Sequence, residues 1–188
     1  LALAIFYVLK YFKEYRNVPI VTNLSTSLIS EKIASKYNTR LMRSSVGEIN
    51  VVNVMQKECA LIGGEGNGGV ILSESHLGRD SLVGAAIILN LISNESLSVN
   101  ELFNLLPKFY IEKSTVHLNN SSNIYIEKLK DLYSHDNINE KDGLKIIRDN
   151  EWVHIRKSNT EPILRIIAES KSIERSKELI EEIKNEIN

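Results

Sequence analysis

The segment RKSNTEP, at positions 156–162, carries a guanidinium, an ammonium, two hydroxyls and an amide within its first five residues. It stands between WVHI and ILRII, two apolar runs that are typical of buried strands. A hairpin connection needs only two to five turn residues. A loop this polar between two strands therefore indicates an anion-binding site as well as a turn.

Arg156 is the centre of this prediction, because its planar guanidinium can make a bidentate contact to phosphate. Ser158, Asn159 and Thr160 add neutral donors, and consecutive loop amides can form an anion-binding nest. Lys157 adds charge, although alternation along the strand can point it elsewhere. The alternative is a surface loop whose Ser, Asn and Thr side chains bond their own backbone.

A second unusual segment is GGEGNGG, at positions 63–69, with five glycines in seven positions. Glycine permits positive φ and close approach of the backbone to a ligand. The two other residues are Glu65, an acceptor when ionised, and Asn67, both donor and acceptor. No Lys-Ser/Thr pair follows, so this is not a phosphate-binding P-loop. The composition suits recognition of hydroxyl groups, as in a sugar, and leaves a flexible linker between strands open as the alternative.

The elements around the glycine loop alternate between strand and helix patterns, which predicts a mixed α/β sheet with helices on both faces. Asp80 is expected to cap the helix that follows the loop, and Ser98 with Glu101 forms the capping-box pattern. The expected helices are 1–15, 25–37, 47–58, 81–92 and the short segment before Pro107, and the expected strands are 18–23, 39–43, 60–62 and 70–72. The helix 81–92 is apolar along most of its length and is expected to be buried on most sides.

The composition changes near residue 108, which predicts domains at 1–107 and 108–188. The segment 107–123 is polar and reads as an irregular linker or domain edge. The rest predicts a small α+β domain with an antiparallel sheet: a helix at 125–133, a hairpin of 143–148 and 152–156, a strand at 163–169 and a helix at 173–187. In the last helix, Ser176, Ile180, Ile183 and Ile187 fall on one stripe.

The overall composition limits the function classes. The sequence has 23 basic and 24 acidic residues, so no net field draws it to nucleic acid or to an anionic membrane. The apolar start, LALAIFYVLKYFKEY, is too short for a membrane span and lacks the features of a signal peptide. The absence of an initiator Met indicates a piece of a longer protein. The single cysteine, Cys59, suits a reducing compartment, and a cytoplasmic location is expected.

Several residues are interpreted structurally. The four histidines show no metal-ligand spacing, and His154 is expected to face solvent or a cleft beside the linker. Trp152 is expected to anchor a strand in the core. Cys59, which continues the helical spacing of Ile49, Val52 and Met55, is expected to lie in the core too.

GGEGNGGVI followed by HLGRD, with VGEINV upstream and RKSNTEPILRI downstream, resembles the carboxy-terminal half of the α-D-phosphohexomutases. This superfamily includes phosphoglucomutases, phosphomannomutases and phosphoglucosamine mutases. The resemblance runs along essentially the whole chain and implies the third and fourth of four domains. It also implies a fold, an activity and site residues, which are expectations at this point.

The resemblance implies that the loop 63–69, in the third domain, binds sugar hydroxyls through Glu65 and Asn67, with Gly64 and Gly66 beside them. The fourth-domain loop binds the phosphate that is not being transferred, which implicates Arg156, Ser158, Asn159 and Thr160. Glu48, Arg79 and Lys157 are possible accessory residues. Many members have Ser in place of Asn67, His in place of Gly69 and His or Lys in place of Glu48.

The family interconverts hexose 1-phosphates and 6-phosphates through a phosphoserine and a bisphosphate intermediate. The resemblance places that serine and an Asp-rich loop for Mg²⁺ in the first two domains, and this sequence has no DGDGDR-like stretch. We therefore expect a recognition segment whose partners are a hexose phosphate and the upstream domains of its own chain, inactive alone. The alternative is a non-catalytic sugar-phosphate-binding module.

Overall fold

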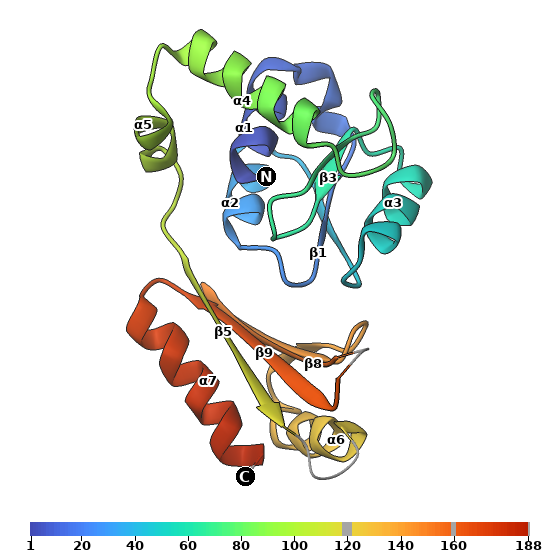
Figure 1. The fold of residues 1–188 in the computed structure, drawn as a ribbon, viewed down its shortest axis with the longest axis vertical. Helices are drawn as coiled ribbons and strands as arrows, with labels where there is room; N and C mark the ends of the chain where they lie inside the picture. The colour runs from blue at the N-terminus through green and yellow to red at the C-terminus, as the bar shows by residue number, and fades with distance from the viewer. Residues whose placement is uncertain (118–121, 159–160, 188) are drawn as a thin grey trace. The chain divides into compact units, whose positions relative to one another are not determined.

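The computed structural model of the chain describes residues 1–117, 122–158 and 161–187. The chain divides into two compact units, Leu1–Pro107 (unit 1) and Lys108–Asn188 (unit 2), and each unit contains its own sheet (Figure 1). None of the described helices is long and apolar enough to cross a membrane.

Unit 1 alternates strands and helices, as the sequence pattern predicts. Its elements are α1 (Ala2–Tyr11), the 3-10 helix η1 (Lys13–Asn17), β1 (Ile20–Asn23), α2 (Ile29–Lys36), β2 (Leu41–Ser44), α3 (Glu48–Lys57), β3 (Ile62–Gly64), β4 (Val70–Leu72), α4 (Ser81–Glu95) and α5 (Val99–Asn104).

The sheet of unit 1 has the strand order β2-β1-β3-β4. β1 pairs in parallel with both β2 and β3, and β3 and β4 form an antiparallel hairpin around the glycine loop. Helix α3 covers one face, while α1, α2 and α4 lie on the other (Figure 1). The predicted mixed α/β sheet with helices on both faces is confirmed. Because β1 is central and parallel to its neighbours, the ends of β1 and β3 and the start of α3 meet at one edge.

Local signals in the sequence set two helix starts. The Asp80 side chain accepts hydrogen bonds from the amides of Leu82 and Val83 at the start of α4. The predicted capping box of α5 is present, with Ser98 and Glu101 bonding each other's backbone amides. These bonds satisfy amides that the helix itself leaves unpaired.

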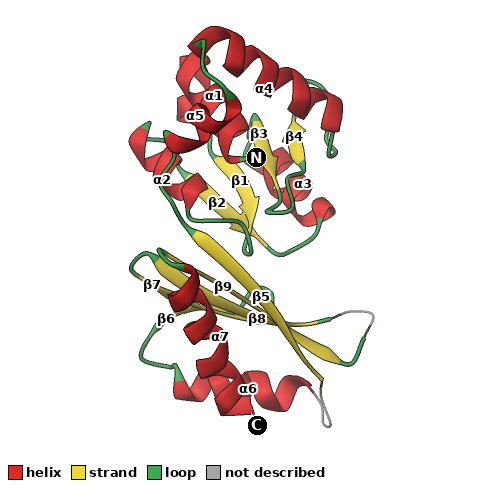
Figure 2. Ribbon diagram, turned by 60° about the vertical axis from the view of Figure 1, so that its left-hand side comes forward, coloured by secondary structure: helices red, strands yellow, loops and turns green. Residues whose placement is uncertain are grey.

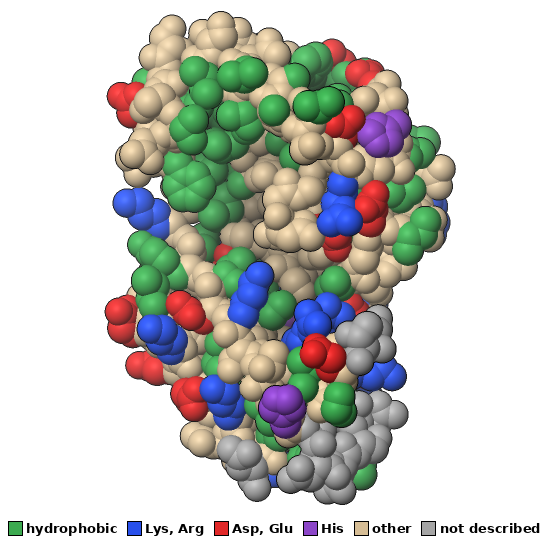
Figure 3. Space-filling model, in the orientation of Figure 1, with side chains coloured by type: hydrophobic (Ala, Val, Ile, Leu, Met, Phe, Trp, Pro, Cys, Tyr) green, Lys and Arg blue, Asp and Glu red, His purple; other side chains and the backbone are tan. Residues whose placement is uncertain are grey.

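Three burial predictions in unit 1 are wrong: those for α4, for Ile49 and for Cys59. In α4 the described burial is confined to a narrow stripe, and Leu82 and Leu89 are 80% and 65% exposed, so the helix is not buried on most sides. Figure 3 shows hydrophobic side chains at the surface over this part of the unit. Ile49 is also exposed, because α3 turns Val51, Val52 and Met55 inward instead. Cys59 is exposed because it follows the end of α3, where the backbone turns to φ +52°.

Unit 2 is an antiparallel sheet with two helices, which confirms the predicted fold class (Figure 2). The strand order is β5-β9-β8-β7-β6. The elements are β5 (Tyr110–His117), α6 (Ser122–Leu132), β6 (Asn137–Asn139), β7 (Leu144–Arg148), β8 (Glu151–Lys157), β9 (Ile163–Ser170) and α7 (Ile173–Ile187).

Within the segment 107–123, residues 110–117 form a strand and not the irregular linker that the composition suggested. Residues Tyr110–His117 form β5, which pairs with β9 along all eight positions, from Tyr110 opposite Ser170 to His117 opposite Ile163. Its side chains alternate between partly buried and exposed for most of its length. Polar residues are acceptable there because β5 is an edge strand, and the backbone of β9 provides its hydrogen bonds.

The core of unit 2 lies between one sheet face and the helices α6 and α7. The predicted stripe of α7 is buried, with Leu179 added to it. The β7–β8 hairpin turns at Asn150, whose φ of +60° suits asparagine. The core residues are Leu129, Leu144, Ile146, Val153, Ile155, Leu164, Ile166, Ala168, Leu179, Ile180, Ile183 and Ile187.

Alternate residues of β7, β8 and β9 carry polar groups on the other sheet face. Trp152 is buried, as predicted, but its Nε1 donates to Glu169 Oε2 at 2.6 Å and Lys145 Nζ lies 4.1 Å from its ring centroid. His154 is fully buried, so the prediction that it faces solvent or a cleft beside the linker is wrong. Its Nε2 donates to the carbonyl of Asp142 at 2.6 Å.

We predict that His154 makes unit 2 less stable in acid. Burial is the main cause that lowers the pKa of His154 from 6.5 to about 4. As pH falls from 6.5 to 4, the unfolded chain takes up a proton that the folded chain does not. The free energy of unfolding should therefore fall across this window, by up to about 3 kcal/mol.

Fluorescence of Trp152, the single tryptophan of the chain, during urea unfolding at several pH values measures this effect. The matched variant is His154→Gln, which keeps a donor for Asp142 but has no titrating group. The same loss of stability in both proteins would contradict the assignment to His154.

Candidate functional site

The glycine loop is a tight reversal between β3 and β4. The amide of Glu65 donates to the carbonyl of Gly69 at 3.2 Å, and the amide of Gly68 donates to the carbonyl of Glu65 at 3.1 Å. Gly64 has φ +154°, and a Cβ there would overlap the Gly69 carbonyl oxygen. The closeness of the two strands is therefore the reason that glycine is required at position 64.

Glu65 is a buried carboxylate, only 6% exposed. Its Oε1 accepts two hydrogen bonds, from Asn23 Nδ2 at 2.8 Å and from the amide of Gly47 at 2.9 Å. Its Oε2 lies 3.7 Å from Arg79 Nη1. The two oxygens therefore have different surroundings: the fold holds Oε1, and Oε2 lies on the side of the guanidinium.

Asn67 lies at the tip of the loop and is exposed. Its Oδ1 accepts from the amide of Gly69 at 3.2 Å, a local turn of the kind that asparagine favours. Gly66 packs close to backbone atoms, because a Cβ there would lie 3.1 Å from the carbonyl oxygen of Ser25. The backbone of Gly64 and Gly66 thus shapes the loop that carries Glu65 and Asn67.

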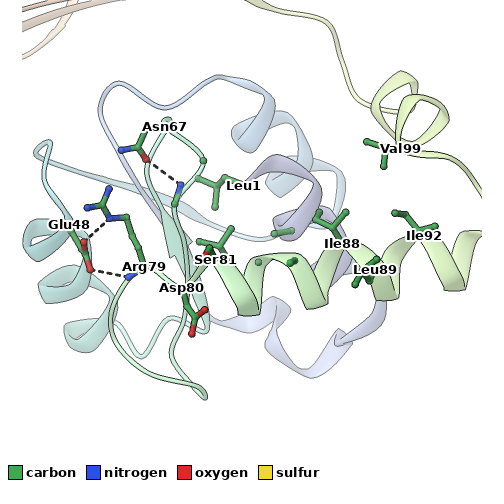
Figure 4. A pocket seen from close by; sticks show the side chains of 16 residues that line it. Leu1, Glu48, Asn67, Arg79, Asp80, Ser81, Ile88, Leu89, Ile92 and Val99 are labelled. Carbon is green, nitrogen blue, oxygen red and sulfur yellow. Dashed lines mark hydrogen bonds and ion pairs between the residues drawn. The ribbon is translucent and has the colours of Figure 1, made fainter.

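Glu48 and Arg79 form an ion pair next to this loop (Figure 4). Glu48 Oε1 accepts from the amide of Arg79 at 2.9 Å, and Glu48 Oε2 accepts from Arg79 Nε at 2.6 Å. The hydrogen bond from the Arg79 backbone, followed by the one from its side chain, lowers the pKa of the Glu48 carboxyl. The hydrogen bond with Glu48 in turn raises the pKa of Arg79.

A groove of about 1030 Å³ runs from this ion pair along α4. Glu48, Asn67 and Arg79 line its polar end, and Ile88 and Ile92 lie toward its apolar end (Figure 4). The structure thus brings the sugar-loop residue Asn67 together with two of the three predicted accessory residues. Glu65 is adjacent to the polar end through Arg79.

The predicted phosphate loop follows β8 in unit 2. Arg156 is half-buried and lies directly opposite Arg165 of β9. The buried Nε atoms of both side chains have no hydrogen-bond partner among the residues that the structure describes. Arg165 Nη2 lies 3.4 Å from Ser158 Oγ, which brings Ser158 beside the pair. Asn159 and Thr160 lie outside the described residues.

Lys157 is separated from this pair by the alternation of the strand. It is exposed and lines a small pocket of about 260 Å³ together with Lys130, Glu140 and Asp142. Successive strand residues point to opposite faces, so Arg156 and Lys157 do not share a binding surface. The structure thus gives no support for Lys157 as an accessory phosphate ligand.

Reasoning from the sequence missed three contributors to these sites: Asn23, Gly47 and Arg165. Arg165 had a detectable signal, since it is the one charged residue within the apolar run ILRII. Asn23 and Gly47 had none, because their contacts with Glu65 join positions 42 and 18 residues apart.

The described residues include no group of three or more His, Cys, Asp and Glu side chains that could hold a metal ion.

An α/β unit with a glycine hairpin, followed by a small antiparallel unit with a polar loop, matches one protein family in both halves. The family model described as phosphoglucomutase/phosphomannomutase, alpha/beta/alpha domain III, matches residues 1–110, and the model of the family's C-terminal domain matches residues 115–186. The chain belongs to the phosphoglucomutase/phosphomannomutase family, within the α-D-phosphohexomutases.

Curated relatives have mutase names. The chain is 36% identical over 164 residues to the phosphoglucomutase/phosphomannomutase of Thermococcus kodakarensis, which covers 86% of this chain and 36% of the relative. It is 38% identical over 170 residues to a phosphoglucosamine/phosphogalactosamine mutase of Sulfurisphaera tokodaii, covering 88% and 37%. The chain thus spans less than two fifths of the length of these relatives.

Solved structures show the same fold. A phosphoglucomutase/phosphomannomutase family protein from Burkholderia thailandensis has a TM-score of 0.80 at 16% identity, covering 99% of this chain and 40% of that one. The N-acetylphosphoglucosamine mutase of Aspergillus fumigatus, in complex with GlcNAc-6P and magnesium, has a TM-score of 0.74 at 12% identity, covering 100% and 46%.

We predict that Gly64→Ala destabilises unit 1 more strongly than Gly68→Ala. A Cβ at position 64 would overlap backbone across the hairpin, whereas a Cβ at position 68 would meet no atom within 4 Å. Both positions have positive φ. We expect a loss of about 3 kcal/mol or more for Gly64→Ala and about 1 kcal/mol for Gly68→Ala. Urea unfolding followed by the amide resonances of unit 1 measures both, and equal losses would contradict the steric argument.

Proposed function

We propose that this chain supplies substrate recognition in a phosphohexomutase, an enzyme that interconverts hexose 1-phosphates and 6-phosphates. Unit 1 binds sugar hydroxyls through Glu65 and Asn67, and unit 2 binds the phosphate that is not being transferred through Arg156, Ser158, Asn159 and Thr160. The pair of facing arginines in unit 2 carries the proposal. The family membership and the mutase names of the relatives support it.

The arginine pair has little anionic compensation among the described residues: Glu161 Oε2 lies 3.7 Å from Arg165 Nη2, and the Glu161 side chain is 59% exposed. Arg156 and Arg165 are directly opposite in the β8–β9 ladder, and like charges at such positions destabilise a sheet. Each also has a buried Nε without a partner among the described residues, and an unmade hydrogen bond to a charged donor is costly. A phosphate dianion offsets the repulsion and accepts from both guanidinium groups. We therefore add Arg165 to the phosphate site.

The site in unit 1 has the opposite character. Glu65 Oε2 is a carboxylate oxygen that a hydroxyl can donate to, and Arg79 Nη1, 3.7 Å away, is a donor that the same hydroxyl or its neighbour can bond to. Arg79 is itself held by Glu48. A sugar with adjacent hydroxyls offers both donors and acceptors, and this is the chemistry that the acid–base pair suits.

The reaction explains why recognition must tolerate two orientations. A phosphoserine passes its phosphoryl group to the free hydroxyl of a hexose monophosphate: the serine O–P bond breaks and the sugar O–P bond forms. The hydroxyl loses its proton and the serine oxygen gains one, which regenerates the serine hydroxyl. The bisphosphate then turns around, and its other phosphate returns to the serine. In each orientation the idle phosphate needs the same cationic site, so charge and a fork of donors matter more than sugar shape.

The serine and a magnesium ion would come from outside this segment. Two solved structures of one similar enzyme support this chemistry by their bound groups: the Aspergillus enzyme was solved with GlcNAc-6P and magnesium, and a variant of it with glucose 1,6-bisphosphate. Magnesium would supply charge neutralisation at the transferred phosphoryl group. This chain's own residues hold the sugar and the idle phosphate.

We predict that Arg156→Ala and Arg165→Ala each weaken phosphate binding. Removing one of two guanidinium groups deletes charge-assisted hydrogen bonds, which corresponds to roughly a tenfold to hundredfold loss of affinity. Titration calorimetry with glucose 1-phosphate and glucose 6-phosphate measures the effect, which should be similar for both isomers. Arg156→Lys should restore affinity only in part, because an ammonium lacks the planar fork.

Lys157→Ala is the matched control, since it removes one positive charge from the neighbouring residue on the opposite face. We expect little change in affinity for this variant. A loss confined to one isomer, or an equal loss in the Lys157 variant, would refute a shared phosphate site.

We also predict that the isolated 188-residue chain binds hexose phosphates without converting them, because the phosphoserine lies elsewhere. Incubation with glucose 1-phosphate, glucose 1,6-bisphosphate and Mg²⁺, followed by ³¹P spectroscopy, should show no 6-phosphate. In a longer protein that includes the serine, turnover distinguishes a mutase from a non-catalytic binding module. Conversion by the chain alone would overturn the assignment of the reacting groups to other domains.

A further inference from the structure

Asn23 is the last residue of β1, one of the two inner strands of the sheet in unit 1. It is 3% exposed, and neither the glycine loop nor the phosphate loop includes it. The carboxyl ends of parallel strands are where ligand sites of α/β sheets form. Asn23 lies at this edge, beside the end of β3, where the glycine loop begins.

The orientation of the Asn23 amide follows from its hydrogen bonds. Its Oδ1 accepts from the amide of Ser25 at 3.0 Å and from Thr26 Oγ1 at 2.8 Å. A backbone amide is only a donor, so the atom that faces Ser25 must be the oxygen. The Nδ2 group must then point to Glu65, whose Oε1 lies 2.8 Å away.

The Glu65 carboxylate is consequently held at one oxygen. Asn23 Nδ2 and the Gly47 amide both donate to Oε1. Arg79 Nη1 is 3.7 Å from Oε2, too far for a direct hydrogen bond. Without the bond from Asn23, the carboxylate could rotate toward the guanidinium and close this distance. Oε2 would then be bonded to Arg79 and would accept less well from a ligand.

We propose that Asn23 is a positioning residue: it holds Glu65 Oε1 and thereby keeps Oε2 beyond hydrogen-bond distance of Arg79 Nη1 and available to a sugar hydroxyl. This inference rests on the proposed function of Glu65 in hydroxyl recognition and adds how that carboxylate is prepared for it. Asn23 does not touch the ligand and acts through Glu65.

One substitution separates this role from support of the 23–26 turn. Asn23→Asp keeps an oxygen for Ser25 and Thr26, but it replaces the donor that faces Glu65 with a second carboxylate oxygen. Thr26→Val is the matched control, because it removes a hydrogen bond to Asn23 Oδ1 and leaves the bond to Glu65 in place. A role in the turn predicts a larger effect for Thr26→Val, and a positioning role predicts a larger effect for Asn23→Asp.

A double variant gives the sharpest readout. In Glu65→Gln the amide oxygen should take the bonds from Asn23 and Gly47, so that the NH₂ group faces outward and cannot accept from a hydroxyl. In Asn23→Asp with Glu65→Gln, an NH₂ group turned inward donates to Asp and places the amide oxygen outward, but it leaves the Gly47 amide without its acceptor. The double variant should therefore recover part of the sugar affinity that the single variants lose, and the unpaired Gly47 amide limits this recovery.

The experiment is titration calorimetry of the 188-residue chain with glucose 1,6-bisphosphate and, separately, with inorganic phosphate. For the bisphosphate we expect at least a tenfold loss in Asn23→Asp and in Glu65→Gln, recovery of part of that loss in the double variant and little change in Thr26→Val. Inorganic phosphate binding, which depends on unit 2, should not change. An unaltered bisphosphate affinity in Asn23→Asp, or a double variant weaker than both single variants, would overturn the inference while Glu65→Gln still tests the proposed function.

A crystal structure of Asn23→Ala tests the orientation without any ligand. We expect the Glu65 carboxylate to turn and bond directly to Arg79, and an unchanged carboxylate would overturn the positioning role. If it turns but Glu65→Gln leaves bisphosphate affinity unaltered, the proposed sugar role of Glu65 fails and the positioning role of Asn23 stands.

Discussion

A carboxylate removed from water needs donors that are already in place, and Glu65 sets this requirement for the whole edge of unit 1. An unsatisfied buried charge would cost several kcal/mol. The donors come from Asn23 at the end of β1 and from the Gly47 amide just before α3. These groups meet because β1 pairs in parallel with both β2 and β3. One carboxyl group thus connects three features of unit 1: the order of the sheet, the glycine at position 64 and the position at which α3 begins.

Unit 2 also holds charged side chains in fixed positions, but these are cations, whereas Glu65 of unit 1 is an anion. Arg156 and Arg165 are held side by side by the β8–β9 ladder, and the backbone of that ladder is fixed by a core on its other face. The fold thus places two like charges directly opposite each other, with the exposed Glu161 carboxylate, 3.7 Å from Arg165, as a partial counter-charge. The packing of the strands on the core can offset the repulsion between the arginines in the free protein. A bound anion relieves the repulsion, which favours anion binding at the pair. Sites built on strands are also more precisely held than sites built on loops alone.

The two sites differ in charge as the two ends of a sugar phosphate differ. Hydroxyl groups need a mixture of acceptors and donors, which Glu65, Arg79 and Glu48 provide in unit 1. A phosphate dianion needs donors only, which the arginines of unit 2 provide. The groove along α4 adds apolar surface beyond the polar end, and α4 leaves Leu82 and Leu89 exposed. The proposed function assigns each unit the part of the substrate that its charges suit.

The sequence by itself determined the features that depend on neighbouring residues. Asp80 as a helix cap, the Ser98–Glu101 capping box, the turn at Asn150 and the stripe of α7 all follow from local spacing, and the two polar loops stood out by composition. The tertiary structure alone decided the features that depend on distant ones. β5 became a strand because β9 lies beside it, and His154 became buried in spite of its polarity. Asn23 and Gly47 joined the site of Glu65 through contacts between segments far apart in the chain, and a single sequence carries no local signal for such contacts. Arg165 stood out as a charge within an apolar run, but only the β8–β9 register placed it opposite Arg156.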